Sequence, residues 1–285
     1  MVSHSRVLIT GMNGFTGVHL SKALTIQGFE CITLGCDLLN RNLVFNNVFK
    51  FKPDYVVHLA GISFAAELDF EAIYKVNIAG TVNLLDALKQ VKSGLKKVIL
   101  ASSATVYGDV LESRLAEQLY PKPVNHYGLS KFTMEHAARI YYDEFPIIIT
   151  RPFNYTGIGH DNRFLIPKII HTYKNNSPSI TLGNLNISRE FNDVRDVVSV
   201  YRLLLLSEFK SGIVNICSGK SIKLLKIINI MNEISGNTLK VYTSEKYSRS
   251  NEIKDLSGDC VKLNDLINYT FKYNIEDTLK HMYEN

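Results

Sequence analysis

The 285-residue sequence predicts an α/β protein in which a doubly wound parallel sheet is followed by a smaller C-terminal lobe. Two observations predict this fold. Short apolar runs alternate with helix-like segments up to residue 152, and this alternation breaks down in the second half of the chain. We therefore place the sheet domain at residues 1–152 and the smaller lobe at residues 153–285, with some segments of the second half returning to the sheet.

Composition excludes several classes of protein. Hydrophobic residues make up 46% of the chain, which is enough for a large core, and the net charge of +5 is spread along the sequence without a basic block. This distribution argues against binding to nucleic acid or to a membrane surface. No apolar run reaches the roughly 18 residues of a membrane span, and a strand predicted from about residue 6 leaves no room for a signal peptide, so we expect a cytoplasmic protein. No metal-type spacing connects the four cysteines, which are Cys31, Cys36, Cys217 and Cys260.

The first unit of the chain has the order strand, glycine turn, helix. Residues 6–10 (RVLIT) predict a strand, residues 11–17 (GMNGFTG) a turn, and residues 19–28 a helix. Gly11 permits the tight turn, Gly14 lets backbone amides approach a pyrophosphate, and Gly17 allows close packing of the helix. The partial positive charge of the helix N-terminus would favour phosphate groups. This unit predicts a dinucleotide-binding site.

The end of the next predicted strand, residues 30–34, bears on the choice of cofactor. In many NAD enzymes an acidic residue at this point binds the ribose hydroxyls. Here Leu34, Gly35 and Cys36 occupy the position, and Asp37 and Leu38 follow. No carboxylate is placed to repel a 2′-phosphate and no arginine is placed to bind one, so NADPH and NADH both remain open, with a slight preference for NADPH.

A helix over residues 40–51 and a strand over residues 55–59 continue the alternation. The small residues that follow this strand leave room for a cofactor passing over the sheet. His58, on the apolar strand, is predicted to be a core residue. The next helix, around residues 74–88, carries Asn77, which fits either a surface position or the site.

The stretch from residue 97 to residue 131 carries the chemistry. A buried strand ends in Ser102 and Ser103, and Tyr127 precedes Lys131 by four residues, which places both side chains on one face of a helix. A tyrosine titrates near pH ~10, and we expect an ammonium one turn away to lower its pKa. With a serine hydroxyl on the same substrate oxygen, the pair suits acid–base chemistry at a carbonyl or carbinol. A Tyr-x-x-x-Lys pair alone is weak, and the glycine turn upstream makes it informative.

In the second half, a strand is predicted over residues 145–151, followed by a loop at residues 154–159 and a helix at residues 163–176. A long helix opens near Asp193, and a strand covers residues 212–218. The remainder is predicted to be mostly helical, with one strand near Val241.

Several motifs occur together in the order seen in the extended short-chain dehydrogenase/reductases, and the chain resembles this family over nearly its whole length. They lie at residues 11–17, 37–38, 58–61, 77, 102–103, 106–108, 127–131, 151–154 and 189–196. Members of this family modify nucleotide-activated sugars on a Rossmann-type fold. Segments 151–169, 182–198 and 214–222 look most like the GDP-6-deoxy-D-mannose reductases, which reduce 4-keto-6-deoxy sugar nucleotides.

The resemblance implies roles for particular residues, and it suggests a homodimer. The implied catalytic set is Ser103, Tyr127 and Lys131. The implied cofactor contacts are Gly11, Asn13, Gly14, Phe15, Thr16, Gly17, Asp37, Leu38, Leu59, Ala60, Gly61, Asn77, Ser102, Tyr127 and Lys131. The implied substrate contacts are Thr105, Asn154, Arg189 and Arg249. A loop arginine can also simply face water.

Three departures from the family pattern bear on the reaction. Sugar 4,6-dehydratases carry an acidic pair directly after the catalytic Ser or Thr, whereas this chain has Ala104 and Thr105 there. His126 stands where the family usually has a proline before the tyrosine, and Tyr155 replaces a frequent histidine. The first departure argues against a dehydratase, and the other two lie where they could alter the fit of the substrate.

The sequence thus predicts NAD(P)H-dependent reduction of the C4 keto group of a GDP- or dTDP-linked 4-keto-6-deoxyhexose. Deoxysugar synthesis for surface polysaccharides such as O-antigen is the expected setting, and a nucleotide-diphosphate sugar is the expected small-molecule partner. Two alternatives remain open: a nucleotide-sugar 4-epimerase that retains NAD, and a non-catalytic NAD(P)-binding regulatory protein.

Overall fold

The computed structural model describes residues 5–63, 69–108, 110, 112, 114–244 and 255–285. Its centre is a six-stranded sheet in the order β10-β5-β4-β3-β1-β2, in which all neighbouring strands are parallel. The strands are β1 (Arg6–Thr10), β2 (Glu30–Thr33), β3 (Tyr55–His58), β4 (Lys97–Ala101), β5 (Ile147–Pro152) and β10 (Gly212–Ile216). This sheet confirms the predicted fold class. Because β2 and β3 lie on opposite sides of β1, the strand order reverses between β1 and β3, and a crevice is expected at that point.

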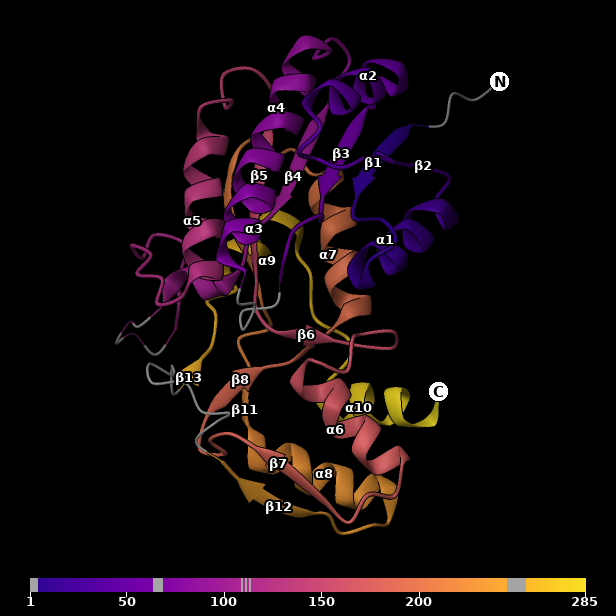
Figure 1. Cartoon of the computed structure of the whole chain (residues 1–285), viewed down its shortest axis with the longest axis vertical. Coiled ribbons are helices and arrows are strands. Elements are labelled where there is room, and N and C mark those ends of the chain that lie inside the picture. The colour runs from indigo at the N-terminus through magenta and orange to yellow at the C-terminus, as the bar shows by residue number, and fades with distance from the viewer. Residues whose placement is uncertain (1–4, 64–68, 109, 111, 113, 245–254) are drawn as a thin grey trace.

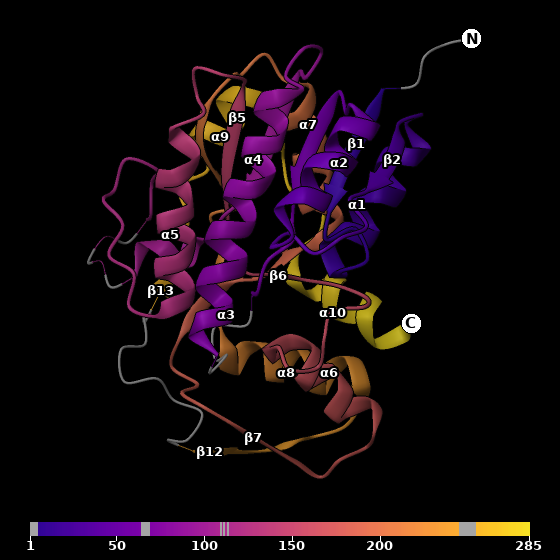
Figure 2. The same cartoon turned by 45° about the horizontal axis from the view of Figure 1, so that its top comes forward.

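Helices cover both faces of the sheet, as Figures 1 and 2 show. One face carries α1 (Phe15–Ile26), α7 (Val194–Leu206) and α9 (Val261–Ile267), and the other carries α2 (Arg41–Phe51), α4 (Thr81–Gln90) and α5 (His126–Arg139). Successive residues of β4 alternate between the two cores: Val98 packs under α4 and α5, whereas Ile99 packs under α7. This alternation follows from the twofold period of a strand, and apolar runs without polar interruption are therefore required.

The second half of the chain forms a separate core beyond the carboxyl ends of the sheet strands (Figure 1). Its helices are α6 (Leu165–Lys174), α8 (Leu224–Ser235) and α10 (Ile275–Glu284). Its strands are β7 (Ser179–Leu182) with β12 (Lys240–Thr243), and the sheet β11 (Ser221–Lys223), β8 (Ser188–Glu190) and β13 (Asp255–Leu256). Since α7, β10 and α9 pack with the first half, segments do return to the large sheet, while the boundary at residue 152 stays a prediction.

Several local differences separate the structure from the sequence-based expectation. Beside the strand predicted near Val241, the remainder of the chain contains β11 and β13. α1 starts at Phe15, four residues before the predicted start, because the helix continues directly from the glycine turn. The predicted helix around residues 74–88 is divided into α3 (Phe70–Tyr74), a π-helical segment (Lys75–Gly80) and α4. The predicted loop at residues 154–159 contains a short strand, β6 (Tyr155–Thr156), which pairs with β9 (Asn192–Asp193).

His58 is a core residue, as predicted. Its ring nitrogens lie 2.6 Å from the Thr10 hydroxyl and 2.8 Å from the Thr81 hydroxyl. Burial lowers the pKa of His58 to about 3, so the imidazole is neutral at physiological pH. His58 therefore joins β1, β3 and α4 and is not available as a ligand or base.

Two carboxylates at the start of α7 anchor the C-terminal segment. Asp193 caps the helix and accepts a hydrogen bond from the Thr278 hydroxyl at 2.9 Å. Asp196 accepts hydrogen bonds from the Tyr269 hydroxyl at 2.6 Å and from the Tyr273 amide at 3.0 Å. Asp193 and Asp196 therefore stabilise the fold.

Within the described ranges, no helix is long and apolar enough to cross a membrane, and no group of three or more metal-ligating side chains occurs.

Candidate active site

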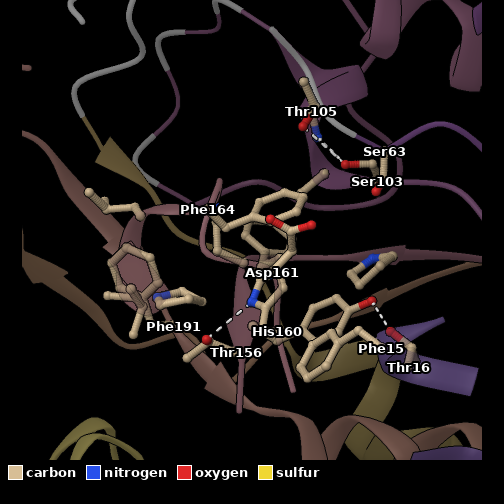
Figure 3. Close-up of a pocket in the computed structure, with 18 of the residues that line it drawn as sticks. Phe15, Thr16, Ser63, Ser103, Thr105, Thr156, His160, Asp161, Phe164 and Phe191 are labelled. Atoms are coloured by element: carbon tan, nitrogen blue, oxygen red, sulfur yellow. Dashed lines mark hydrogen bonds between the residues drawn. The ribbon is translucent and has the colours of Figure 1, made fainter. Parts of the chain in front are cut away.

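A cavity of about 1100 Å³ lies at the carboxyl ends of the sheet strands, between the sheet and the second-half lobe (Figure 3). Most of the residues singled out from the sequence line it. They are Gly11, Gly14, Phe15, Thr16, Gly17, Leu59, Ala60, Gly61, Ser102, Ser103, Thr105, Tyr127, Lys131, Asn154 and Arg189. The cavity therefore connects the glycine turn, the Tyr-Lys pair and the candidate substrate residues in one continuous space.

Of the remaining predicted site residues, four do not line this cavity and a fifth lies outside the described residues. Asn13 is exposed in the turn, and Asp37 is exposed with its carboxylate accepting a hydrogen bond from the Leu39 amide at 2.9 Å. Leu38 is buried against the helix at Gly80. The fourth, Asn77, acts from behind the cavity wall. The last, Arg249, lies outside the described residues. Their cofactor and substrate roles stay predictions.

The glycine turn has the geometry that a pyrophosphate requires. Gly11 has φ +69°, and a Cβ there would lie 2.8 Å from the Ala60 amide nitrogen, across the point where the strand order reverses. A Cβ at Gly17 would lie 2.2 Å from the Gly11 carbonyl oxygen. Gly14 caps α1 without a side-chain hydrogen bond, and the first turn has no acidic residue, so the helix amides are available to an anion. The residues fit a dinucleotide.

Aromatic rings from the second half of the chain pack onto this turn. The rings of Phe15 and His160 are stacked with centroids 4.4 Å apart, and Phe164 lies 4.4 Å beyond His160 (Figure 3). The Thr156 hydroxyl lies 3.1 Å from His160 Nδ1, and burial lowers the pKa of His160 to about 4, which keeps it neutral. Sequence reasoning missed His160 and Phe164, because no local pattern indicates contact with a turn about 145 residues earlier.

Asn77 is buried and holds the loop after β3. Its side-chain oxygen accepts a hydrogen bond from the Ile62 amide at 2.9 Å, and its side-chain nitrogen donates to the Ser130 hydroxyl at 3.0 Å. A Cβ at Gly61 would lie 2.8 Å from Asn77 Oδ1 and 3.2 Å from Lys131 Nζ. This excludes the surface interpretation of Asn77. The π-helical segment brings the side chain into this position, and such segments are frequent at functional sites.

Tyr127 and Lys131 lie on the first turns of α5, whose start is fixed by the Asn125 cap. Lys131 Nζ donates to the Ala101 carbonyl at 2.8 Å. Ser103 follows β4 by two residues, its side chain lowers the pKa of Tyr127, and its Oγ donates to the Thr105 hydroxyl at 3.0 Å (Figure 3). The fold therefore brings together the three residues proposed for the chemistry.

The predicted acidity of Tyr127 is wrong for this structure. Burial raises the pKa of Tyr127 to about 12, and the hydrogen bond with Ser103 opposes this only in part. Burial lowers the pKa of Lys131 to about 8 for the same reason, since a low-dielectric site disfavours any charged form. At neutral pH Tyr127 therefore carries its proton, which is the form required of a proton donor.

Comparison with known proteins identifies the family. The model of the NAD dependent epimerase/dehydratase family matches residues 7–217. The chain belongs to this family. It is 32% identical to the GDP-6-deoxy-D-talose 4-dehydrogenase of Aggregatibacter actinomycetemcomitans, over 98% of this chain and 97% of that one. It is 30% identical to the GDP-6-deoxy-D-mannose reductase of Pseudomonas aeruginosa, over 96% and 95%.

Solved structures agree with this family assignment. A Burkholderia cenocepacia protein has a TM-score of 0.92 at 35% identity, covering 98% of this chain and 97% of that one. RMD from Pseudomonas aeruginosa, solved with NADPH, has a TM-score of 0.87 at 28% identity, covering 99% and 97%. As a member of the epimerase/dehydratase family, the protein is an NAD(P)-dependent enzyme that modifies nucleotide sugars.

The two residues that directly follow Ser103 provide no acidic pair for elimination chemistry. Ala104 and Thr105 form a short 3₁₀ turn at the cavity wall and offer no carboxylate there. In the described part of the cavity lining, Asp161 is the one acidic residue, and it forms an ion pair with Arg163 at 3.1 Å. Arg189, on β8, lines the far side of the cavity.

Proposed function

We propose that this protein reduces the C4 keto group of a nucleotide-linked 4-keto-6-deoxyhexose with NADPH or NADH, and that GDP-sugars are the first substrates to test. The observation that carries the proposal is that Ser103, Tyr127 and Lys131 line the same cavity as the glycine turn. Two relatives at 30% identity or above are both named for GDP-linked 6-deoxyhexoses, which supports this substrate class. A cytoplasmic homodimer that serves surface-polysaccharide synthesis belongs to the same proposal.

The residues of the chain would divide the reaction as follows. When bound, the reduced nicotinamide supplies a hydride. The Tyr127 hydroxyl donates its proton to the C4 oxygen as negative charge develops there, and the Ser103 hydroxyl holds that oxygen by a hydrogen bond. The Lys131 ammonium, one helical turn from Tyr127, would hold the ribose of the cofactor by hydrogen bonds.

The far side of the cavity suits the nucleotide diphosphate. Arg189 lines it, Asn154 lines the cavity where the chain leaves β5, and a guanidinium is the side chain best shaped to bind two phosphate oxygens together. This contact would supply binding energy remote from C4, which the enzyme could use to orient the keto group.

A 4-epimerase that retains NAD is the second candidate. It would use Ser103, Tyr127 and Lys131 in both directions, and a UDP-glucose 4-epimerase from Oryza sativa matches 95% of the chain at 27% identity. The packing of His160 on Phe15 over the glycine turn would favour retention of the cofactor. A non-catalytic role is disfavoured because the fold assembles the whole catalytic set.

The reductase and the epimerase are separated by one set of measurements on the purified protein. We would measure bound nucleotide after denaturation, then NADPH and NADH consumption with 4-keto-6-deoxy sugars linked to GDP, dTDP, UDP and CDP. A thermal-shift series with the four nucleoside diphosphates ranks the bases, because a ligand that binds only the folded state stabilises it. A reductase consumes one added NAD(P)H per sugar reduced. Tightly bound NAD together with sugar interconversion in the absence of added cofactor would instead establish the epimerase.

A further inference from the structure

A carboxylate that no part of the proposed reaction uses is buried behind the catalytic residues. Glu135 lies one helical turn after Lys131 on α5 and is fully buried. It accepts hydrogen bonds from the Ser102 hydroxyl at 2.6 Å and from Arg151 Nε at 2.9 Å and Nη2 at 2.6 Å. Burying a carboxylate destabilises the fold unless both oxygens accept hydrogen bonds, and these hydrogen bonds offset that cost. A functional role would explain why a carboxylate is buried at this position.

The three hydrogen bonds join the three elements that carry the site. Ser102 directly follows β4 and precedes Ser103. Arg151 lies at the end of β5 and leads into the segment that contains Asn154, and Glu135 itself belongs to α5. One side chain therefore bridges the ends of two strands to the helix that carries Tyr127.

The contacts of Glu135 continue further into the core through Arg151. The Arg151 guanidinium lies 4.8 Å from the centre of the Tyr107 ring, and the Tyr107 hydroxyl donates to Asn215 on β10 at 2.7 Å. Because both ends of the chain of contacts are buried, Glu135 is held in one position. Because Glu135 is held in one position, it can hold Ser102 and Arg151 in place as well.

Charge gives the second reason. The ionisable groups around Lys131 are His58 from β3, Glu135 and Tyr127 from α5, and Arg151 from β5 behind Glu135. His58 is neutral and Tyr127 is protonated at physiological pH. Glu135 is the group that raises the pKa of Lys131 against the lowering effect of burial.

We propose that Glu135 is a positioning residue of the active site: its carboxylate fixes Ser102 and Arg151 against α5 and supplies the negative charge that faces the Lys131 ammonium. The inference rests on the proposed roles of Ser103, Tyr127 and Lys131. It is distinct from them, because Glu135 does not line the cavity and would contact neither sugar nor cofactor.

Two substitutions separate the effect of the negative charge of Glu135 from the effect of its side-chain length. Glu135→Gln keeps the length of the side chain and removes the charge, whereas Glu135→Asp keeps the charge and shortens the side chain, so that it no longer spans Ser102 and Arg151 together. Glu144→Gln is the matched control, because Glu144 pairs with Lys89 and Lys92 at the surface, away from the cavity. The readouts are the titration of Lys131, followed by NMR of the protein labelled at the lysine Cε and assigned with Lys131→Met, and kcat and KM across pH.

We expect Glu135→Gln to move the Lys131 midpoint and the alkaline limb of kcat down together by about one pH unit. Glu135→Asp should leave the midpoint in place and lower kcat at least about fivefold, with the KM of the sugar nucleotide changed by less than about twofold. The control should match the wild-type protein. A wild-type Lys131 midpoint in Glu135→Gln, or a wild-type kcat in Glu135→Asp, overturns the proposal.

If Glu135→Gln leaves the buried Arg151 uncompensated and does not fold, Glu135→Asp still tests the inference, since it keeps the ion pair's charges. The NMR titration needs no substrate. If the wild-type protein reduces no 4-keto sugar, the proposed function fails while the titration still decides whether Glu135 sets the charge of Lys131.

Discussion

The Thr16 hydroxyl lies 2.8 Å from the phenolic oxygen of Tyr155, although the two residues are separated by 139 positions. Thr16 belongs to the first turn of α1, where the backbone amides would meet the cofactor pyrophosphate, and Tyr155 belongs to the segment that follows β5. This hydrogen bond and the ring stack of Phe15 on His160 hold the second half of the chain against the glycine turn.

We expect Tyr155→Phe and Thr16→Val each to weaken NAD(P)H binding about three- to tenfold, because each removes one partner of this bond. In a double-mutant cycle the two changes should be coupled by about 0.5–1.5 kcal/mol. Fluorescence titration of NADPH measures both. Tyr242→Phe, at an exposed tyrosine, is the control. Strictly additive effects would show that the bond does not support the turn.

Tyr127→Phe should lower kcat for ketone reduction by about 10²–10⁴-fold, because the proton donor is lost while the ring that fills the site remains. NADPH affinity should change by less than about threefold. Initial rates and a binding titration on the same preparation check this. Turnover near the wild-type rate would remove Tyr127 from the mechanism.

The pH dependence of reduction should be governed by Lys131 and not by Tyr127. Lys131, with a pKa of about 8, is charged below that pH and neutral above it, whereas Tyr127 stays protonated up to about pH 12. We therefore expect kcat to fall as pH rises through about 8. A pH–rate profile measures this fall in kcat. Lys131→Arg keeps the positive charge, so the activity that remains in this variant should not fall as pH rises through about 8.

Burial of the charged Lys131 should also lower the free energy of unfolding. Its pKa is lowered from 10.5 in the unfolded chain to about 8, so the unfolded state binds more protons between these values and stability rises with pH across that window. Below about pH 8 the full cost is present. After allowance for the lost bond to the Ala101 carbonyl, Lys131→Met should stabilise the protein by about 1–2 kcal/mol at pH 7 while abolishing turnover.

Urea unfolding at pH 7 and at pH 10 checks the Lys131→Met prediction, with the gain at pH 7 expected to shrink at the higher pH. A variant less stable than the wild-type protein at pH 7 would contradict it, and would mean that the ammonium contributes more to the fold than its burial costs.

Gly17→Ala should lower NADPH affinity at least about tenfold, because its Cβ would lie 2.2 Å from the Gly11 carbonyl and force the turn apart. Gly236→Ala is the matched control. Gly236, unlike Gly17, has a positive φ of +69°, but no atom lies within 4 Å of the added Cβ, so Gly236→Ala should cost about 1 kcal/mol of stability and leave binding unchanged. Equal losses of binding in both variants would point to general destabilisation.

Much of the fold and part of the site could be read from local pattern. Short stretches of sequence contain the strand at residues 6–10, the glycine turn and the spacing of Tyr127 and Lys131. Such a stretch is long enough to show the period of a strand or a helix. The order of these motifs also pointed to the family that the comparisons confirmed.

The tertiary structure decided what no window contains. It brought Tyr155 and His160 onto the glycine turn, and it placed Glu135 between the ends of two strands. It also reversed the expected shift of Tyr127, since spacing along a helix shows a neighbouring charge but not the depth of burial. Burial and long-range contacts depend on all elements packed around a side chain, so the sequence by itself determined which groups are available, and packing determined their charge and their partners.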